Sequence, residues 1–158
     1  MAPLLQPKRV MVSFRKILAL VDFGESSKQA LEVALGLAKE FGAVLTLLHT
    51  WEIPVYGYGA MEFSAMDMLT PIQVAATQQL DALVAEVRRQ HPDTRGMLTR
   101  GVVWREVLTI IEQDKPDLVV MGTHGRRGVG RAILGSVAEK IVRMSPVPVL
   151  TVRSKTTE

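Results

Sequence analysis

A glycine-rich segment late in the chain holds the residues best suited to chemistry. Gly122 and Gly125 are separated by two residues, Arg126 follows directly, and nine residues separate Gly125 from Gly135 and Ser136. Glycine lets main-chain N–H groups approach a ligand closely, and a helix beginning at the end of the segment would add unpaired N–H groups and partial positive charge. Such a loop suits a polyanion, and phosphate is the obvious candidate.

Single residues exclude two common nucleotide motifs. Gly130 and Gly135 have the separation of a P-loop, but Ser136 stands where its phosphate-binding lysine belongs. Gly128 and Gly130 could begin a dinucleotide fingerprint, but Ile133 stands where its third glycine belongs.

The elements on either side of the segment are a buried strand and a helix. The apolar run 118–121 follows Pro116 and Asp117, and it is typical of a strand covered on both faces. Ser136 and Glu139 have the spacing of a capping box, which predicts a helix beginning at Ser136. The Ser136 hydroxyl could therefore bind a phosphate, cap its helix, or do both.

Apolar runs and amphipathic stretches alternate through the rest of the chain. They predict five strands, at 17–21, 44–50, 95–101, 118–121 and 147–152. Helices are expected between the strands, one beginning at Ser26 with Gln29, another at Thr70 with Pro71. The result is an α/β fold, an open five-stranded parallel sheet with helices on both faces. Residues 51–69 form a long connection, either a loop folded over the sheet edge or a mobile flap near a ligand or partner.

Length and composition fit one domain, because 158 residues that are 47% hydrophobic can bury one sizeable core. We expect the domain over 14–153, a loose extension or upstream start over 1–13, and a short tail over 154–158. The extension lacks the apolar stretch of a secretory signal. The chain has no cysteine, which excludes a disulfide scaffold and cysteine-based metal or redox sites and agrees with a cytoplasmic location. No apolar run approaches the roughly 18–20 residues of a membrane span.

Basic charge is concentrated in and after the glycine-rich segment. The whole chain carries a net charge of +3, yet residues 123–158 hold seven Lys or Arg against two acids. This distribution suits an anionic ligand. Nucleic acid is a poor candidate, because the sequence shows neither an aromatic stacking platform nor a recognition motif.

The spacing of the glycines and Ser136 resembles the ATP-binding signature of the universal stress protein family. The resemblance covers most of the chain, roughly 14–153. It includes three further stretches, 16–22, 47–50 and 146–152. It implies an adenine-nucleotide α-hydrolase-like fold with strand order 3-2-1-4-5, in which the first and fourth strands lie side by side.

In that order the ends of the first and fourth strands, Asp22 and Met121-Gly122, would meet at the switch point where such sheets bind ligands. Three glycines and two main-chain positions would hold the phosphates: Gly122, Gly125, Gly135, Ser136 and Val137. Arg126 is the best candidate for a side-chain contact with phosphate. His124 could also touch a phosphate, or be an ordinary loop residue.

The ribose and the base would lie at the ends of the first two strands. Asp22 could accept hydrogen bonds from ribose hydroxyls, or be a turn aspartate. By resemblance, Leu20, Val21 and the main chain of Thr50 would line the adenine pocket. His49 is expected to be a hydrogen-bonded histidine at the edge of the core.

The resemblance implies an ATP-binding regulator or adaptor in the stress response whose output goes to a protein partner. Phosphoryl transfer needs an oriented nucleophile. Asp22 is the only carboxylate that the sequence places near the phosphates, and no acid pair or serine–histidine arrangement accompanies it. Binding with little or no turnover is therefore expected. A slow ATPase, or a dimeric scaffold that has lost its nucleotide, are the alternatives. Mg²⁺ or Mn²⁺ could accompany the phosphates.

The last strand predicts a partner. In the implied order residues 147–152 form an edge strand that is apolar, and Pro148 is compatible with an edge position. An uncovered edge invites pairing with another chain. The family commonly dimerises through this strand, so a two-fold homodimer is expected.

Overall fold

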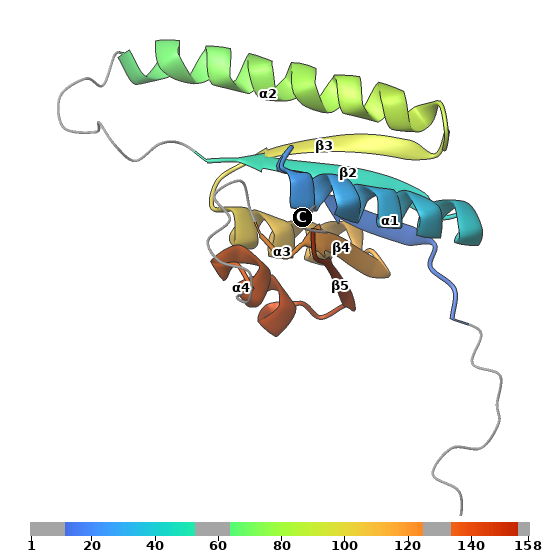
Figure 1. Cartoon of the computed structure of the whole chain (residues 1–158). Helices are drawn as coiled ribbons and strands as arrows, with labels where there is room; N and C mark the ends of the chain where they lie inside the picture. The colour runs from blue at the N-terminus through green and yellow to red at the C-terminus, as the bar shows by residue number, and fades with distance from the viewer. Residues whose placement is uncertain (1–11, 53–63, 125–133, 155–158) are drawn as a thin grey trace, which may run out of the picture.

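A computed structural model gives the backbone of residues 12–52, 64–124 and 134–154, with their side chains except those of 64–68. Strands and helices alternate along the chain (Figure 1). Their bounds are β1 (Lys16–Leu20), α1 (Glu25–Phe41), β2 (Val44–Trp51), α2 (Ser64–Arg88), β3 (Thr94–Arg100), α3 (Val103–Asp114), β4 (Leu118–Gly122), α4 (Ser136–Met144) and β5 (Val149–Val152). Each predicted strand lies within two residues of its observed bounds.

The strands form one parallel sheet in the order β3-β2-β1-β4-β5, which confirms the predicted fold class and strand order. β1 lies in the middle, with Leu20 paired to Leu48 of β2 and Ala19 paired to Val120 of β4. Its central residues are almost completely buried, because helices cover both faces of the sheet and a continuous apolar run is stable only in such a place.

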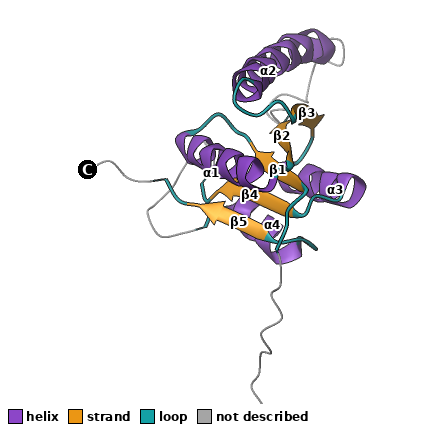
Figure 2. Ribbon diagram, turned by 90° about the vertical axis from the view of Figure 1, so that its right-hand side faces the viewer, coloured by secondary structure: helices purple, strands orange, loops and turns teal. Residues whose placement is uncertain are grey.

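The helices cover the sheet in two layers. α1 and α2 pack on one face, and α3 and α4 pack on the other (Figure 2). Side chains of a strand alternate between the two faces, so Ile17 and Ala19 belong to the core beneath α1 and α2, and Leu18 belongs to the other core. The winding direction changes at the junction of β1 and β4, which is therefore the switch point of the sheet.

The predicted start of α2 is wrong. The helix begins at Ser64, and Pro71 lies inside it rather than in its first turn. Residues 64–69 include alanine, methionine and leucine, which favour helix, and they extend the helix upstream of the proline. Pro71 lies on an exposed part of α2, where water can hydrogen-bond the carbonyl that proline leaves unpaired. Of the predicted 51–69 connection, residues 53–63 lie outside the described residues.

Both predicted serine caps are also wrong. Glycines occupy the N-cap positions, Gly24 for α1 and Gly135 for α4, and neither helix has a side-chain capping hydrogen bond. Ser26 is buried inside the first turn of α1, and its hydroxyl donates to the Val152 carbonyl at 3.3 Å. Ser136 is the first residue of α4, one position too late to cap it.

The described helices include none that combines the length and apolarity needed to cross a membrane.

Candidate functional site

The carboxyl ends of β1 and β4 lie next to each other at the switch point. Asp22 follows β1 within two residues, and Gly122 is the last residue of β4. The pairing of Ala19 with Val120 fixes the two strands in register, so the predicted ribose-binding and phosphate-binding positions reach the same edge of the sheet. α1 and α4 both begin at this edge, and the first N–H groups of a helix have no partner within the helix.

Asp22 holds the turn between β1 and α1. Its Oδ1 accepts the Gly24 N–H at 2.7 Å, and its own N–H donates to the Ser27 hydroxyl at 3.2 Å. Between them, Phe23 has a left-handed backbone with φ of 63°, a conformation that is strained for a residue with a Cβ. The turn role left open in the sequence is thus observed for one carboxylate oxygen. The ribose role stays a prediction.

Gly122 is required by the packing of α1 against β4. A Cβ at this position would lie 2.9 Å from the carbonyl carbon of Ser26 and would also collide with its hydroxyl. The first turn of α1 can therefore approach the end of β4 only because residue 122 has no side chain. This role is independent of any ligand, and the glycine spacing alone does not reveal it.

The two ends of the glycine-rich segment are held together. The Gly135 N–H donates to the Thr123 carbonyl at 2.8 Å, and the Thr123 N–H donates to the Val152 carbonyl at 3.0 Å. A Cβ on Gly135 would lie 3.1 Å from the Thr123 oxygen, so a glycine there suits this closure. The segment leaves β4 and returns to the start of α4 at one place. Gly125 and Arg126, within 125–133, lie outside the described residues.

Sequence reasoning assigns no role to Thr123, and it leaves His124 as either a phosphate contact or an ordinary loop residue. Thr123 is buried, with 4% of its surface exposed, and its Oγ1 lies 2.9 Å from Nδ1 of His124. The Nε2 atom of His124 is buried and has no hydrogen-bond partner in the described structure. A buried polar atom without a partner is rare in proteins, and here it lies at the entry to a segment suited to an anionic group.

The other predicted nucleotide-binding residues differ in what they can offer a ligand. The side chains of Val21 and Met121 belong to the two cores, with 5% and 4% of their surface exposed. The Val21 N–H donates to the Leu48 carbonyl at 2.8 Å, and its carbonyl accepts from His49, so both main-chain groups of Val21 have partners. Leu20 and Val137 are half-buried against the core under α3 and α4. The Thr50 hydroxyl pairs with that of Thr99 at 2.8 Å, which leaves the predicted main-chain role of Thr50 open.

His49 is a hydrogen-bonded histidine at the edge of the core, as predicted. Its Nδ1 lies 2.7 Å from the Val21 carbonyl, and its ring packs on Phe23 with 4.8 Å between ring centroids. Because a carbonyl can only accept, the Nδ1 atom carries the hydrogen. His49 thus joins the end of β2 to the turn that carries Asp22.

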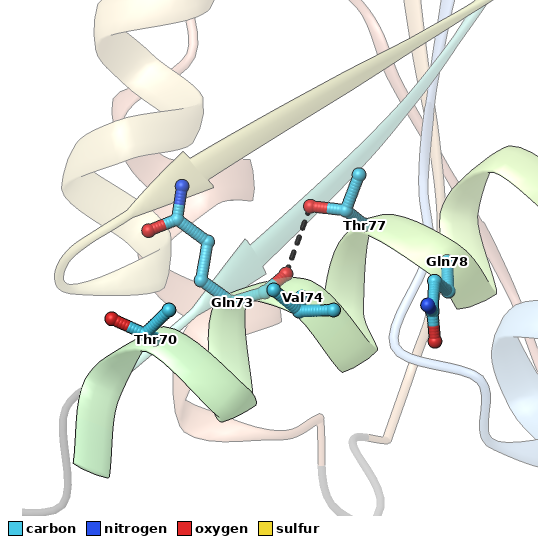
Figure 3. Close-up of a pocket in the computed structure, with 5 residues that line it drawn as sticks. All are labelled: Thr70, Gln73, Val74, Thr77 and Gln78. Atoms are coloured by element: carbon cyan, nitrogen blue, oxygen red, sulfur yellow. Dashed lines mark hydrogen bonds between the residues drawn. The ribbon is translucent and has the colours of Figure 1, made fainter. Parts of the chain in front are cut away.

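A shallow pocket of about 310 Å³ lies elsewhere, on the exposed surface of α2 (Figure 3). Its lining consists of Thr70, Gln73, Val74, Thr77 and Gln78. The Thr77 hydroxyl donates to the Gln73 carbonyl at 2.8 Å within the helix. These five side chains carry no charge, so the pocket does not suit phosphate and is separate from the switch-point site.

Nothing in the described ranges groups three or more His, Asp or Glu side chains so that they could hold a metal ion by themselves.

The fold and the site define a doubly wound α/β domain with a glycine-rich segment at its switch point. The sequence model of the universal stress protein family matches residues 13–153, and the chain belongs to this family. A universal stress protein of Thermus aquaticus is 32% identical over 140 residues, covering 89% of this chain and 99% of the relative.

Solved structures share the fold. Universal stress protein UspA from Lactobacillus plantarum superposes with a TM-score of 0.80 at 22% identity, covering 90% of this chain and 99% of that one. A universal stress protein in complex with cAMP gives a TM-score of 0.65 at 18% identity, covering 91% and 100%.

Proposed function

We propose that this chain is an ATP-binding universal stress protein, a nucleotide-occupied regulator or adaptor of the cytoplasm with little or no turnover. The observation that carries the proposal is the hydrogen bond from Gly135 to Thr123, which brings the two described ends of the glycine-rich segment together after β4. Main-chain N–H groups in such a closed segment suit phosphate oxygens. A structural neighbour in complex with cAMP supports an adenine nucleotide as the ligand.

The candidate residues divide into three groups, which would bind the phosphates, the base and the ribose. The phosphates would lie on the main chain of Gly135, Ser136 and Val137 at the start of α4, where the helix dipole favours negative charge. Gly125 and Arg126 would complete this part. By the family resemblance, the base would lie against Leu20, Val21 and the main chain of Thr50, with Met121 at the adjoining strand end. These assignments rest on the resemblance and on where the strands end, and each is testable by substitution.

Asp22 would bind the ribose hydroxyls through its carboxylate. Its Oδ1 already accepts the Gly24 N–H at 2.7 Å, and phosphoryl transfer would need an oriented nucleophile beside the phosphates. For this reason we favour binding over hydrolysis. ATP would occupy the site as a charged ligand that can exchange. A protein partner would respond to whether the site is occupied.

Native mass spectrometry of freshly purified protein tests the proposal directly, since a retained nucleotide is identified by its mass. Calorimetric titrations with ATP, AMP and cAMP then rank the ligands with and without Mg²⁺ or Mn²⁺. We expect ATP to bind and to remain intact through the titration. The proposal fails if the purified protein carries no nucleotide and none of the three produces heat.

Turnover separates the proposed regulator from a slow ATPase. An ATPase of this site would release phosphate above the spontaneous rate and lose that activity in Asp22→Ala. A regulator would show the background rate in both proteins.

We also infer a homodimer formed through residues 147–152. β5 is an edge of the sheet, and three apolar side chains on and beside it are exposed, namely Leu150 (37%), Val142 (45%) and Met144 (53%). An edge strand flanked by exposed apolar side chains is suited to pairing with a second copy. Sedimentation velocity at micromolar concentration gives the oligomeric state, and a monomer would contradict the inference.

A further inference from the structure

Among the described residues, one ring nitrogen of His124 has a hydrogen-bond partner and the other has none. Its Nδ1 lies 2.9 Å from the Thr123 hydroxyl oxygen, whereas its Nε2 is buried with no hydrogen-bond partner in the described part of the chain. In a neutral imidazole one nitrogen donates and the other accepts. Which nitrogen carries the hydrogen therefore decides what kind of atom the buried Nε2 can receive.

The surroundings of Thr123 decide the tautomer. The threonine is 4% exposed, and its main-chain N–H and carbonyl are both used, by Val152 and Gly135. Among the described residues, the His124 ring is the partner of its hydroxyl. If Nδ1 carried the hydrogen, the buried hydroxyl hydrogen and the Nε2 lone pair would both lack partners. If the hydroxyl donates to Nδ1, only one group lacks a partner, the Nε2–H.

The unpartnered donor lies in the base of the glycine-rich segment. A Cβ on Gly135 would be 3.8 Å from the Cα of His124, so the histidine is adjacent to the start of α4. A buried N–H needs an acceptor, and phosphate oxygens accept without donating. We propose that His124 donates its Nε2–H to a phosphate oxygen of the bound nucleotide, and that Thr123 is a positioning residue that fixes this tautomer. The proposal rests on the proposed function.

The tautomer is testable without any nucleotide. Long-range ¹H–¹⁵N correlation spectra of ¹⁵N-histidine-labelled protein distinguish the two ring nitrogens, and His124 is assigned by the signal missing from His124→Gln. The other two histidines are internal references, because carbonyls accept from Nδ1 of His49 and from Nε2 of His91. His124 should show the hydrogen on Nε2 and resemble His91. A hydrogen on Nδ1 would overturn the proposal.

Thr123→Val tests the positioning role, since valine keeps the shape of threonine and removes the hydroxyl. The His124 spectrum should then show a mixture of tautomers, while the His49 and His91 signals stay unchanged. An unaltered His124 tautomer would mean that Thr123 does not set it.

The phosphate contact is tested by titrating ATP and adenosine into wild type, His124→Leu and His124→Gln. Leucine removes the donor, and ATP affinity should fall about tenfold or more, the loss of one hydrogen bond to a charged group. Glutamine places an amide N–H near the position of Nε2 and should restore most of it. Adenosine affinity should be the same in all three proteins.

The outcomes separate this contact from the proposed function. ATP binding that is equal in wild type and His124→Leu overturns the contact alone, whereas wild-type protein that binds no ATP overturns the proposed function and the contact with it. If the leucine variant does not fold, the wild-type spectrum decides. The Nε2 signal should shift on adding ATP and not on adding adenosine, and an unshifted signal would overturn the contact.

Discussion

At the scale of single residues, Gly122 is required by packing and is also a predicted phosphate-binding position. The first turn of α1 approaches the end of β4 so closely that a Cβ would lie 2.9 Å from the Ser26 carbonyl carbon. A ligand on the same backbone would impose its own need for glycine. Substitutions at Gly122 therefore report on packing before they report on binding.

We expect Gly122→Ala to lower the free energy of unfolding by about 1–3 kcal/mol, because the helix must move away from the strand. Urea denaturation measures the change. Gly36→Ala is a matched control within α1, since an added Cβ meets nothing within 4 Å. It should raise the free energy of unfolding by roughly 0.5–1 kcal/mol through helix propensity. Equal stability of Gly122→Ala and wild type would show that the close approach is unimportant.

Substitutions at Asp22 can separate its role in the turn from its proposed role in binding the ligand. Asparagine keeps an oxygen that can accept the Gly24 N–H, whereas alanine does not. Asp22→Ala should lower the free energy of unfolding by about 1 kcal/mol, and Asp22→Asn by much less. Both should weaken ATP about tenfold, because both lose the charge that binds ribose hydroxyls. Denaturation and calorimetry measure the two effects, and full ATP affinity in Asp22→Asn would remove the ribose role.

At the scale of elements, the ends of α1 and α3 have the same backbone shape with different residues. Gly42 ends α1 with φ of 62°, and Lys115 ends α3 with φ of 48°. Both are left-handed, a conformation that suits glycine and strains lysine. Glycine at position 42 is typical of such an end, and Pro116 indicates that α3 must end before it. The lysine at position 115, however, gives no signal of a left-handed conformation.

Lys115→Gly should raise the free energy of unfolding by about 1 kcal/mol, because it relieves the left-handed strain at the end of α3. Urea denaturation measures the gain. Lys115→Ala removes the same charge and keeps a Cβ, so it should give no gain. An equal effect of the two substitutions would assign the change to charge and not to backbone conformation.

The order and type of the elements could be predicted from the sequence because buried parallel strands need continuous apolar runs. The run in β1 and the run in β4 are both of this kind, and both lie fully covered. The start of α2 could not be predicted by the same reasoning. A proline after threonine is typical of a first turn, yet helix-favouring residues upstream of Pro71 extend the helix over it.

The candidate site was predictable in its location and not in its internal contacts. Asp22 and Gly122 could be brought to one edge from the implied strand order. The role of Ser26 depends on a carbonyl 126 residues away in the chain, and no local pattern reveals such a partner. Thr123 likewise gains its importance from burial next to His124, which only the packed structure shows.

At the scale of the whole molecule, the two edges of the sheet offer a comparison. Leu150 lies on the β5 edge, and Val74 lies on α2, which packs beside the opposite edge strand, β3. We expect Leu150→Lys to convert the dimer to monomer, because the ammonium groups would be brought into an apolar contact. Val74→Lys should leave the dimer intact. Sedimentation velocity distinguishes these results. A Leu150→Lys variant that stays dimeric would show that the interface lies elsewhere.

The hydrogen bonds between β5 and β4 determine which main-chain groups of β5 face outward and could pair with a second copy. The Pro148 and Val152 carbonyls accept from Val119 and Thr123, at 3.0 Å each, and so face inward toward β4. Main-chain groups of successive residues in a strand point in opposite directions, which turns those of Val149 and Thr151 outward. If Val149 of one copy pairs with Thr151 of an antiparallel copy, the symmetry axis passes beside Leu150. Two leucines would then meet on that axis, and the lysine variant would set two like charges face to face.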